Sequence, residues 1–374
     1  MIRPRKVVES LPKYHPPLEG RAGKLRLDFN ENTIGCAPQV LRTLRRALSA
    51  DWLSRYPEYE ECRQTLAKYF GVAADEVLFS NGVDDAIKLV CDTFVEPGDV
   101  LLIPAPTFPM YQFFQSVAGG KTTLVRYDEN LRLPMEKILT ALTNRIRWVA
   151  LANPNNPTGT LIPKSDLRTI LRAAPDTLVL VDEAYFDFSG ETVLPWIKNF
   201  QNLVVTRSFS KAFGLAALRM GFVFANSELL AMMRRAHGAY PVNSLALSCA
   251  LEAGKEEDYV RRYAQMVRAS RAELCDALNA LGVPYAPSAA NFVLTRVGEK
   301  APEIAHRLRQ KGILVRDWSY DAHLRNYLRI TVGSAAQTRL LIEELKHHEP
   351  LMEKRNGSGV WREFAAYSPA GYFT

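Results

Sequence analysis

Lys211 lies within NLVVTRSFSKAFGLAALRMGF, residues 202–222, directly after an apolar run that is typical of a buried strand. Small hydroxyl residues precede it, and Gly214, Arg219 and Gly221 follow it. A lysine at a strand end can attack a carbonyl carbon and form a Schiff base if its neighbours lower the pKa of its ammonium group. An arbitrary lysine is far more often a solvated surface residue. The choice between these two interpretations therefore depends on which other residues the sequence places near Lys211.

Polar and aromatic side chains also follow other apolar runs of the chain. The segments are NGVDDAIKL (81–89), PAPTFPMY (104–111), NPNNPTG (153–159), DEAYFDF (182–188) and RSFSKAFG (207–214). Each segment alone is typical of an ordinary turn, an exposed acidic pair or a core aromatic residue. In an open α/β sheet, however, the loops at the carboxyl ends of the strands converge on one ligand site. We therefore expect these side chains to lie together.

Pyridoxal phosphate is a cofactor that needs this combination of groups. It forms a Schiff base with a lysine, and it accepts electrons while an acid keeps its ring nitrogen protonated. Asp182 is the candidate acid. The cofactor's phosphate requires backbone N–H groups at a helix N-terminus and a cation, which Gly82, Val83, Asp84 and Arg219 could supply.

The cofactor's ring sets two further requirements. Its 3-oxygen needs hydrogen-bond donors, for which Asn156 and Tyr185 are the candidates, and its face can stack on Phe108. Together these residues predict a pyridoxal-phosphate site at one edge of the sheet.

Short apolar runs rich in β-branched residues alternate with helical patterns between residues 58 and 225. The runs are 77–80, 100–103, 148–152, 178–181, 203–206 and 222–225. This alternation predicts an α/β unit whose sheet is mostly parallel and covered by helices on both faces. After a long helical pattern at 256–282, the runs NFVLTRV, GILVR and YLRITVG predict strands of a smaller α+β unit, with a helix at 301–310.

The length of 374 residues exceeds that of one ordinary core, so we expect two domains with flanking segments. Residues 1–50 are expected to join the small domain, 51–255 to form the large cofactor-binding domain and 256–348 to form the small domain. Residues 349–374 form a tail whose aromatic residues predict packing on the body or on a partner subunit.

Four segments follow one another along the chain: NPNNPTG, DEAY, RSFSKAFGLAALRMG and YLRITVG. Their order and their spacings resemble those of the class I/II, fold-type I pyridoxal-phosphate aminotransferases. The resemblance runs from about residue 10 to residue 346. The resemblance implies an aspartate-aminotransferase-like fold, a homodimer, and the use of an amino donor and a 2-oxo acid.

The same resemblance implies a role for each candidate residue. Lys211 would be the Schiff-base lysine and Asp182 the partner of the pyridinium nitrogen, with Tyr185 as a further catalytic residue. Asn156 and Tyr185 would bind the 3-oxygen, and Phe108 would stack on the ring. The implied phosphate ligands are the backbone at Gly82, Val83 and Asp84 with Ser208, Ser210 and Arg219, and Tyr56 from the partner subunit.

Within this family, LPKYHPP, DFNEN and VRDWSY resemble the histidinol-phosphate branch. That likeness implies that L-histidinol phosphate and 2-oxoglutarate give imidazole acetol phosphate and L-glutamate. Tyr14, Arg316 and Arg329 would surround the substrate's phosphate. The chain departs from the branch pattern at Lys13, Val83 and Pro241. The nearest alternatives on the same scaffold are an aromatic amino-acid aminotransferase and a threonine-phosphate decarboxylase, which differ only in the pocket.

Composition argues against several other classes of protein. The net charge of +7 is dispersed without a compact basic run, which argues against nucleic-acid binding. The cysteines and histidines show no metal-binding spacing, so we expect no metal. No apolar run approaches a membrane span, and the first residues lack the apolar core of a signal peptide, so we expect a cytoplasmic protein.

Two rival functions remain to be weighed. A nucleotide-binding α/β protein would carry GxGxxG or GxxxxGK[ST], and the sequence contains neither pattern. A non-catalytic pyridoxal-phosphate regulator would carry a nucleic-acid-binding module before the sheet, and no such module is recognisable.

Overall fold

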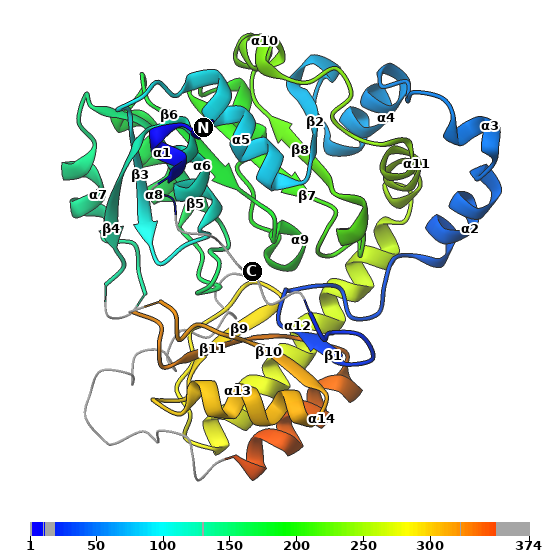
Figure 1. The fold of residues 1–374 in the computed structure, drawn as a ribbon, viewed down its shortest axis with the longest axis vertical. Coiled ribbons are helices and arrows are strands. Elements are labelled where there is room, and N and C mark those ends of the chain that lie inside the picture. Colours follow the sequence, from blue (N-terminus) through cyan, green and yellow to red (C-terminus); the bar gives the residue numbers. More distant parts are fainter. Residues whose placement is uncertain (1, 10, 12–18, 129–130, 322, 349–374) are drawn as a thin grey trace.

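The computed structural model describes residues 2–9, 11, 19–128, 131–321 and 323–348 (Figure 1). Its larger sheet has the strand order β2 (Val77–Asn81), β8 (Met220–Phe224), β7 (Leu203–Ser208), β6 (Leu178–Asp182), β5 (Ile146–Ala152), β3 (Val100–Ala105) and β4 (Lys121–Arg126). β8 runs antiparallel to both of its neighbours, and the other pairs are parallel. The carboxyl ends of β2, β3, β5, β6 and β7 therefore meet at one edge.

The central strands are buried on both faces, which explains why their sequences are continuously apolar. Along β6, Leu178 and Leu180 pack into one hydrophobic cluster, and Val179 and Val181 pack into the other. This alternation follows from the two-residue repeat of a strand.

Helices cover both faces of the larger sheet, and the last two described helices pack in the smaller unit. They are α1 (Lys6–Glu9), α2 (Pro38–Ala47), α3 (Ala50–Leu53), α4 (Glu60–Phe70), α5 (Val83–Phe94), α6 (Met110–Ala118), α7 (Met135–Ala141), α8 (Lys164–Ala173), α9 (Phe186–Ser189), α10 (Ser227–Ala236), α11 (Ser244–Ala253), α12 (Glu257–Ala280), α13 (Ala301–Gln310) and α14 (Ala335–His347). The helices α5, α6 and α10 supply one cluster, and α8, α9 and α12 supply the other.

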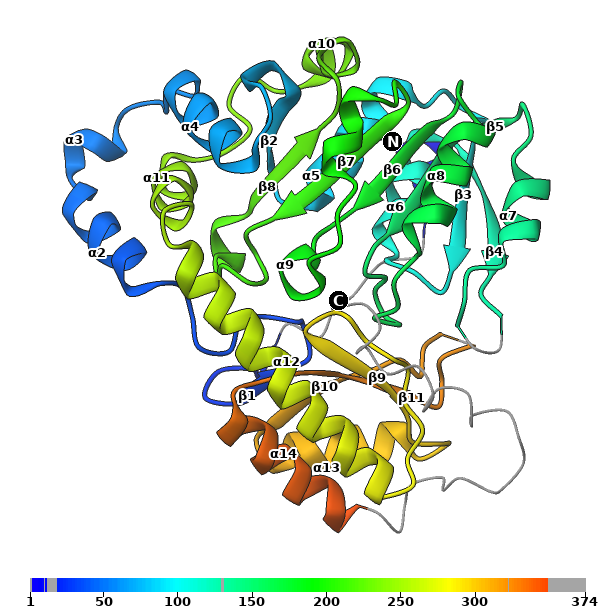
Figure 2. The ribbon, with the colours of Figure 1, turned by 180° about the vertical axis from the view of Figure 1, so that it is seen from behind.

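The smaller sheet has the order β1 (Leu25–Leu27), β10 (Ile313–Asp317), β11 (Tyr327–Thr331) and β9 (Phe292–Arg296). β1 pairs with β10 in parallel, which brings the N-terminal segment into this sheet. The antiparallel register of β10 and β11 places Arg316 opposite Arg329. The long helix α12 runs from the larger sheet to the smaller one, where it packs against α14 (Figure 2).

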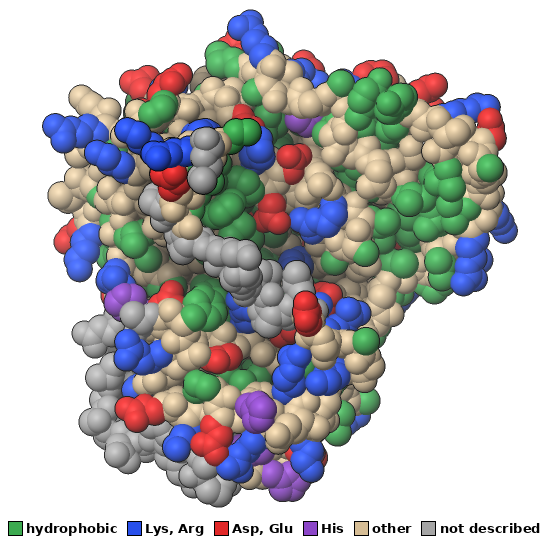
Figure 3. Space-filling model, in the orientation of Figure 1, with side chains coloured by type: hydrophobic (Ala, Val, Ile, Leu, Met, Phe, Trp, Pro, Cys, Tyr) green, Lys and Arg blue, Asp and Glu red, His purple; other side chains and the backbone are tan. Residues whose placement is uncertain are grey.

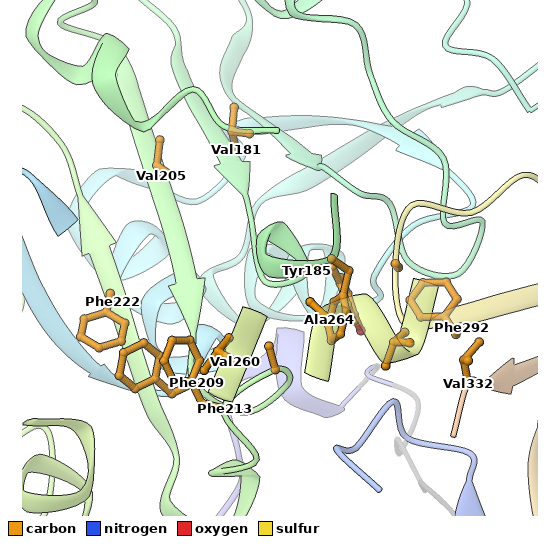
Figure 4. Packing of buried hydrophobic residues seen from close by; sticks show 14 of the residues in the cluster. Val181, Tyr185, Val205, Phe209, Phe213, Phe222, Val260, Ala264, Phe292 and Val332 are labelled. Carbon is orange, nitrogen blue, oxygen red and sulfur yellow. The ribbon is translucent and has the colours of Figure 1, made fainter. Parts of the chain in front are cut away.

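One hydrophobic cluster continues from the larger sheet into the smaller one (Figure 4). Phe209 stacks on Phe213 with ring centroids 3.8 Å apart and meets Phe222 edge-on at 4.8 Å. At the other end, Tyr185 meets Phe292 of β9 edge-on at 5.1 Å. This shared core fixes the loops at the edge of the larger sheet against the smaller sheet.

The predicted α/β unit with a mixed, mostly parallel sheet and a smaller α+β unit is confirmed. Two strands were not predicted, the edge strand β4 and the short strand β1. The division of the chain at residues 50, 255 and 348 stays a prediction, and the tail at 349–374 lies outside the described residues.

Two kinds of feature are absent from the residues that the structure describes. There, we find no helix that combines the length and the apolar character needed to cross a membrane. In the same ranges, no cluster of His, Cys, Asp and Glu side chains could hold a metal ion.

Candidate active site

A cavity of about 230 Å³ lies where the strand ends of the larger sheet face the smaller sheet. Its wall on the side of the larger sheet contains Val83, Asp84, Phe108, Pro109, Ala152, Asn156, Asp182, Ala184, Tyr185, Ser208, Ser210, Lys211 and Arg219. The opposite wall contains Phe29, Asn30, Arg316, Trp318, Tyr320 and Arg329. The loops after β2, β3, β5, β6 and β7 thus converge on one site.

Lys211 follows β7 and directs its Nζ across the cavity. Nζ donates a hydrogen bond to the backbone carbonyl of Phe29 at 3.0 Å. Burial, followed by the positive charge of Arg329, lowers the pKa of Lys211 to about 8. The amine is therefore easier to deprotonate than that of a solvated lysine, as attack on a carbonyl carbon requires.

Asp182 ends β6 and is 5% exposed. Its Oδ2 accepts a hydrogen bond from the Tyr111 hydroxyl at 2.7 Å. Its Oδ1 accepts from the Ala184 N–H at 3.0 Å and from Thr206 Oγ1 at 3.2 Å. Burial raises the pKa of this carboxyl group, and the donated hydrogen bonds oppose that rise. The carboxylate is thus held in a fixed plane at the cavity wall.

The residues expected at the cofactor's ring line the same cavity as Asp182. The Tyr185 oxygen accepts a hydrogen bond from Asn30 Nδ2 at 2.8 Å. Asn156 Oδ1 accepts from Arg329 Nη1 at 2.6 Å. The Phe108 ring meets Tyr111 edge-on at 5.8 Å, which leaves Phe108 as an aromatic wall of the cavity.

The N-terminus of α5 forms a cradle for an anion. Gly82 precedes the helix with a φ of 79°, and a Cβ there would lie 2.3 Å from Arg219 Nη2. Arg219 forms an ion pair with Asp84 at 3.2 Å. Ser210 Oγ is buried and has no hydrogen-bond partner within the described part of the chain. Helix N–H groups, a cation and a hydroxyl group without a partner together suit a phosphate.

Two buried arginines face the cavity from the smaller sheet. Arg316 and Arg329 are each 6% exposed. Arg329 Nη2 donates to the Asp28 carbonyl at 2.7 Å, while its Nε has no hydrogen-bond partner among the described residues. Arg316 Nη2 donates to the Tyr320 hydroxyl at 3.2 Å, and Tyr320 stacks on Trp318. This wall suits an anionic substrate group.

The structure brings together most of the residues that the sequence singled out. Gly82 lies next to the cavity at the start of α5, rather than on its wall. Tyr56 is 76% exposed and stacks on Tyr240 at 4.3 Å, so it lies outside this cavity. Tyr14 and Lys13 lie outside the described residues.

Sequence reasoning missed several residues of the cavity and its surroundings. Phe29, Asn30, Trp318 and Tyr320 lie within DFNEN and VRDWSY, which served only as markers of a branch. Tyr111 supports Asp182 from α6 and gave no signal beyond an aromatic residue in a helical pattern.

Comparison with known proteins gives a consistent assignment. The family model described as aminotransferase class I and II matches residues 22–345, a range that contains every residue of the cavity wall named above. The histidinol-phosphate aminotransferase of Caldanaerobacter subterraneus is 36% identical over 86% of this chain and 92% of that protein. Histidinol-phosphate aminotransferase 1 of Pseudomonas aeruginosa is 34% identical over 90% of this chain and 97% of that protein.

A solved structure resembles the whole fold. The histidinol-phosphate aminotransferase of Sinorhizobium meliloti in complex with pyridoxal-5'-phosphate superposes with a TM-score of 0.85. It is 26% identical and covers 94% of this chain and 98% of its own. With both sheets and the whole cavity inside the matched range, the chain belongs to the aminotransferase class I and II family.

Proposed function

We propose that this chain is a pyridoxal-phosphate-dependent aminotransferase of histidine biosynthesis. Its reaction converts L-histidinol phosphate and 2-oxoglutarate into imidazole acetol phosphate and L-glutamate. The observation that carries the proposal is the cavity with a partly buried lysine, a buried carboxylate and an anion cradle on one wall and two buried arginines on the other. The relatives named histidinol-phosphate aminotransferase support the choice of substrate.

The residues of the larger sheet fit pyridoxal phosphate group by group. Ser210 Oγ lacks a partner beside the N-terminus of α5, and Arg219 supplies a cation there, so this end would hold the phosphate. Asp182 would hold the ring nitrogen, and Lys211 would hold the cofactor covalently. When bound, this cofactor supplies a sink for the electrons that a substrate's α-carbon releases.

The chain's own residues then carry the proton transfers. Once the substrate's amino group has displaced it from the cofactor, Lys211 Nζ would be free to take the proton from the substrate's α-carbon, and its lowered pKa of about 8 favours the neutral amine that this step needs. Asp182, kept in place by Tyr111 and Thr206, would supply the negative charge that keeps the ring nitrogen protonated. Asn156 and Tyr185 would hold the 3-oxygen of the ring.

The two arginines would serve the anionic groups of both substrates in turn. Arg329 contacts Asn156 as well as the backbone of Asp28, so it lies at the junction of the two walls. We assign it the contact shared by the substrate phosphate and the carboxylates of glutamate. Arg316 lies opposite Arg329 on the neighbouring strand and donates to Tyr320, and we assign it to the phosphate.

Measured half-reactions test this assignment of substrate. Single-turnover rates of wild type and Arg316→Ala should be compared with L-histidinol phosphate and with L-glutamate. We expect Arg316→Ala to slow the first at least about tenfold more than the second, because the lost guanidinium contact costs about 2 kcal/mol or more. Equal losses on both donors, or faster turnover of unphosphorylated aromatic amino acids by wild type, would favour the aromatic aminotransferase instead. Release of carbon dioxide from threonine phosphate would favour the decarboxylase.

We further propose that the enzyme is a homodimer. Large apolar side chains are exposed along α2, α3 and the segments beside them, including Leu41, Leu48, Leu53, Tyr56 and Tyr240. Figure 3 shows apolar side chains gathered on this side of the molecule, over α2, α3 and α11. A patch of this kind marks a protein interface. A second copy covering it would bring Tyr56 to the phosphate cradle of its partner.

A further inference from the structure

Asn30 is a buried residue whose backbone and side-chain polar groups all form hydrogen bonds. It follows β1, is 1% exposed and has a φ of 56°, a left-handed conformation that asparagine tolerates better than most residues. Its N–H donates to Thr331 Oγ1 at 3.0 Å, and its carbonyl accepts from Asn291 Nδ2 at 3.1 Å. Its Oδ1 accepts from Thr331 Oγ1 at 3.1 Å, and its Nδ2 donates to the Tyr185 oxygen at 2.8 Å.

These contacts determine which way the Asn30 amide faces. Thr331 Oγ1 accepts the backbone N–H of Asn30, so the hydroxyl hydrogen of Thr331 is free to go to Asn30 Oδ1. The side-chain oxygen therefore faces Thr331, and the side-chain NH₂ group faces Tyr185. An amide NH₂ group can only donate.

The orientation of Asn30 in turn determines what the Tyr185 hydroxyl can do. Because Tyr185 accepts a hydrogen bond from Asn30, its own hydrogen has to point elsewhere. Tyr185 lines the cavity, and Lys211 Nζ lies 5.7 Å from the centre of its ring. Burial raises the pKa of Tyr185, so the phenol keeps its hydrogen at neutral pH.

We propose that Asn30 is a positioning residue for Tyr185, which it holds as a hydrogen-bond donor directed into the cavity. This inference rests on the proposed function, because the acceptor is the 3-oxygen of the bound cofactor. Thr331 lies on β11 and Asn291 directly precedes β9, whereas Tyr185 follows β6. Asn30 therefore also couples the smaller sheet to the catalytic wall of the larger sheet.

Three variants test the inference: Asn30→Gly, Tyr185→Phe and the double variant. Glycine accepts the left-handed backbone, so Asn30→Gly removes the side chain without adding strain there. The main readout is the pH midpoint at which the visible absorbance of the cofactor-bound protein changes. A donor at the 3-oxygen stabilises its anionic form, so loss of the donor raises this midpoint.

We expect Asn30→Gly to raise the midpoint in the same direction as Tyr185→Phe, and to lower kcat/KM about three- to tenfold, as for the loss of one hydrogen bond. In the Tyr185→Phe background, Asn30→Gly should change the midpoint no further, because the hydroxyl group that it orients is gone. Urea unfolding of each variant reports the purely structural cost separately.

The possible failures can be told apart. If Tyr185→Phe leaves the midpoint unchanged, the proposed role of Tyr185 is wrong, and the role of Asn30 falls with it. If Tyr185→Phe raises the midpoint but Asn30→Gly does not, or if the two shifts add in the double variant, only the inference about Asn30 is overturned.

Discussion

At the scale of single residues, the site concentrates charges that the protein interior disfavours. Arg329 is buried and Lys211 is partly buried at the cavity, and the pKa of each is lowered, chiefly by desolvation. Lys211 Nζ is hydrogen-bonded to the Phe29 carbonyl, which carries no formal charge. In the absence of cofactor, a protonated Lys211 therefore destabilises the folded state.

The pH dependence of stability without cofactor follows from this. Between pH 8 and about 10.5, the unfolded chain keeps the proton on Lys211 and the folded chain has lost it, so this residue makes the free energy of unfolding rise with pH. Lys211→Met should consequently be more stable than wild type at pH 7, by about 1 to 3 kcal/mol. That advantage should shrink as the pH approaches 10.5. Urea titrations of cofactor-free protein at several pH values measure this difference in the free energy of unfolding. Lys198→Met, at an exposed lysine, is the control. An advantage for Lys211→Met that stays constant with pH would contradict the lowered pKa.

Asp182 permits a second prediction at this scale. Asp182→Asn keeps the shape of the side chain and can keep the two hydrogen bonds that Oδ1 accepts from Ala184 and Thr206, but it removes the charge. Each pKa unit lost at the cofactor's ring nitrogen corresponds to about 1.4 kcal/mol, so kcat should fall at least about tenfold. Cofactor affinity, measured by equilibrium dialysis, should fall much less. The exposed Asp176→Asn serves as the matched control. Near-wild-type turnover of Asp182→Asn would refute the role.

At the scale of elements, the anion cradle depends on a close approach between β8 and the turn before α5. Gly221 of β8 pairs with Ser80 of β2, and a Cβ at Gly221 would lie 2.6 Å from the carbonyl carbon of Gly82 and 2.7 Å from Ser80 Oγ. Backbone atoms cannot move aside as a flexible side chain can, so an added methyl group has to displace the turn.

Gly221→Ala should therefore widen the cradle. We expect it to lower the free energy of unfolding by about 1 to 3 kcal/mol and to weaken cofactor binding more than Gly238→Ala does. Gly238 is the matched control, because a Cβ there meets nothing within 4 Å. Unfolding curves and cofactor titrations of both variants check the prediction. Equal behaviour of the two variants would show that the close approach has no functional consequence.

The sequence predicted the central strands well and the peripheral ones poorly. β5, β6 and β7 are buried on both faces, so their apolar runs are unambiguous. β4 is an edge strand with several partly or fully exposed residues, and KTTLVR lacks a continuous apolar signal. β1 has three residues, and its pairing with β10 spans most of the chain. Local pattern carries no information about such a distant contact.

Prediction of the cavity from the sequence had the same limit. The strand-end loops could be placed together because parallel strands align their carboxyl ends. Asn30 could not be assigned to Tyr185, because that contact depends on how the N-terminal segment lies against β11. Tyr111 could not be assigned to Asp182, because a tyrosine in a helix gives no signal of its partner in another element.

At the scale of the whole molecule, the proposed dimer makes a quantitative prediction. If each active site combines Lys211 of one subunit with Tyr56 of the other, Lys211→Ala and Tyr56→Ala can complement each other in mixed dimers. Random exchange of equal amounts makes about half of the dimers mixed, and one site in each is intact, so about a quarter of the wild-type activity should return.

Activity should be assayed before and after subunit exchange, at a cofactor concentration that limits Tyr56→Ala. A mixture of Lys211→Ala with the double variant Lys211→Ala/Tyr56→Ala is the control and should stay inactive. Sedimentation should report dimers throughout. An absence of complementation between dimers that do exchange would place Tyr56 outside the active site.

The covalent attachment of the cofactor to Lys211 is the central claim. Reduction of the cofactor-loaded protein with borohydride, followed by digestion and mass mapping, locates the pyridoxyl group directly. We predict one labelled peptide that carries the group on Lys211, no such label in Lys211→Ala, and a folded Lys211→Ala protein without turnover. A pyridoxyl group on another lysine of the wild-type protein, or turnover by Lys211→Ala, would contradict the account.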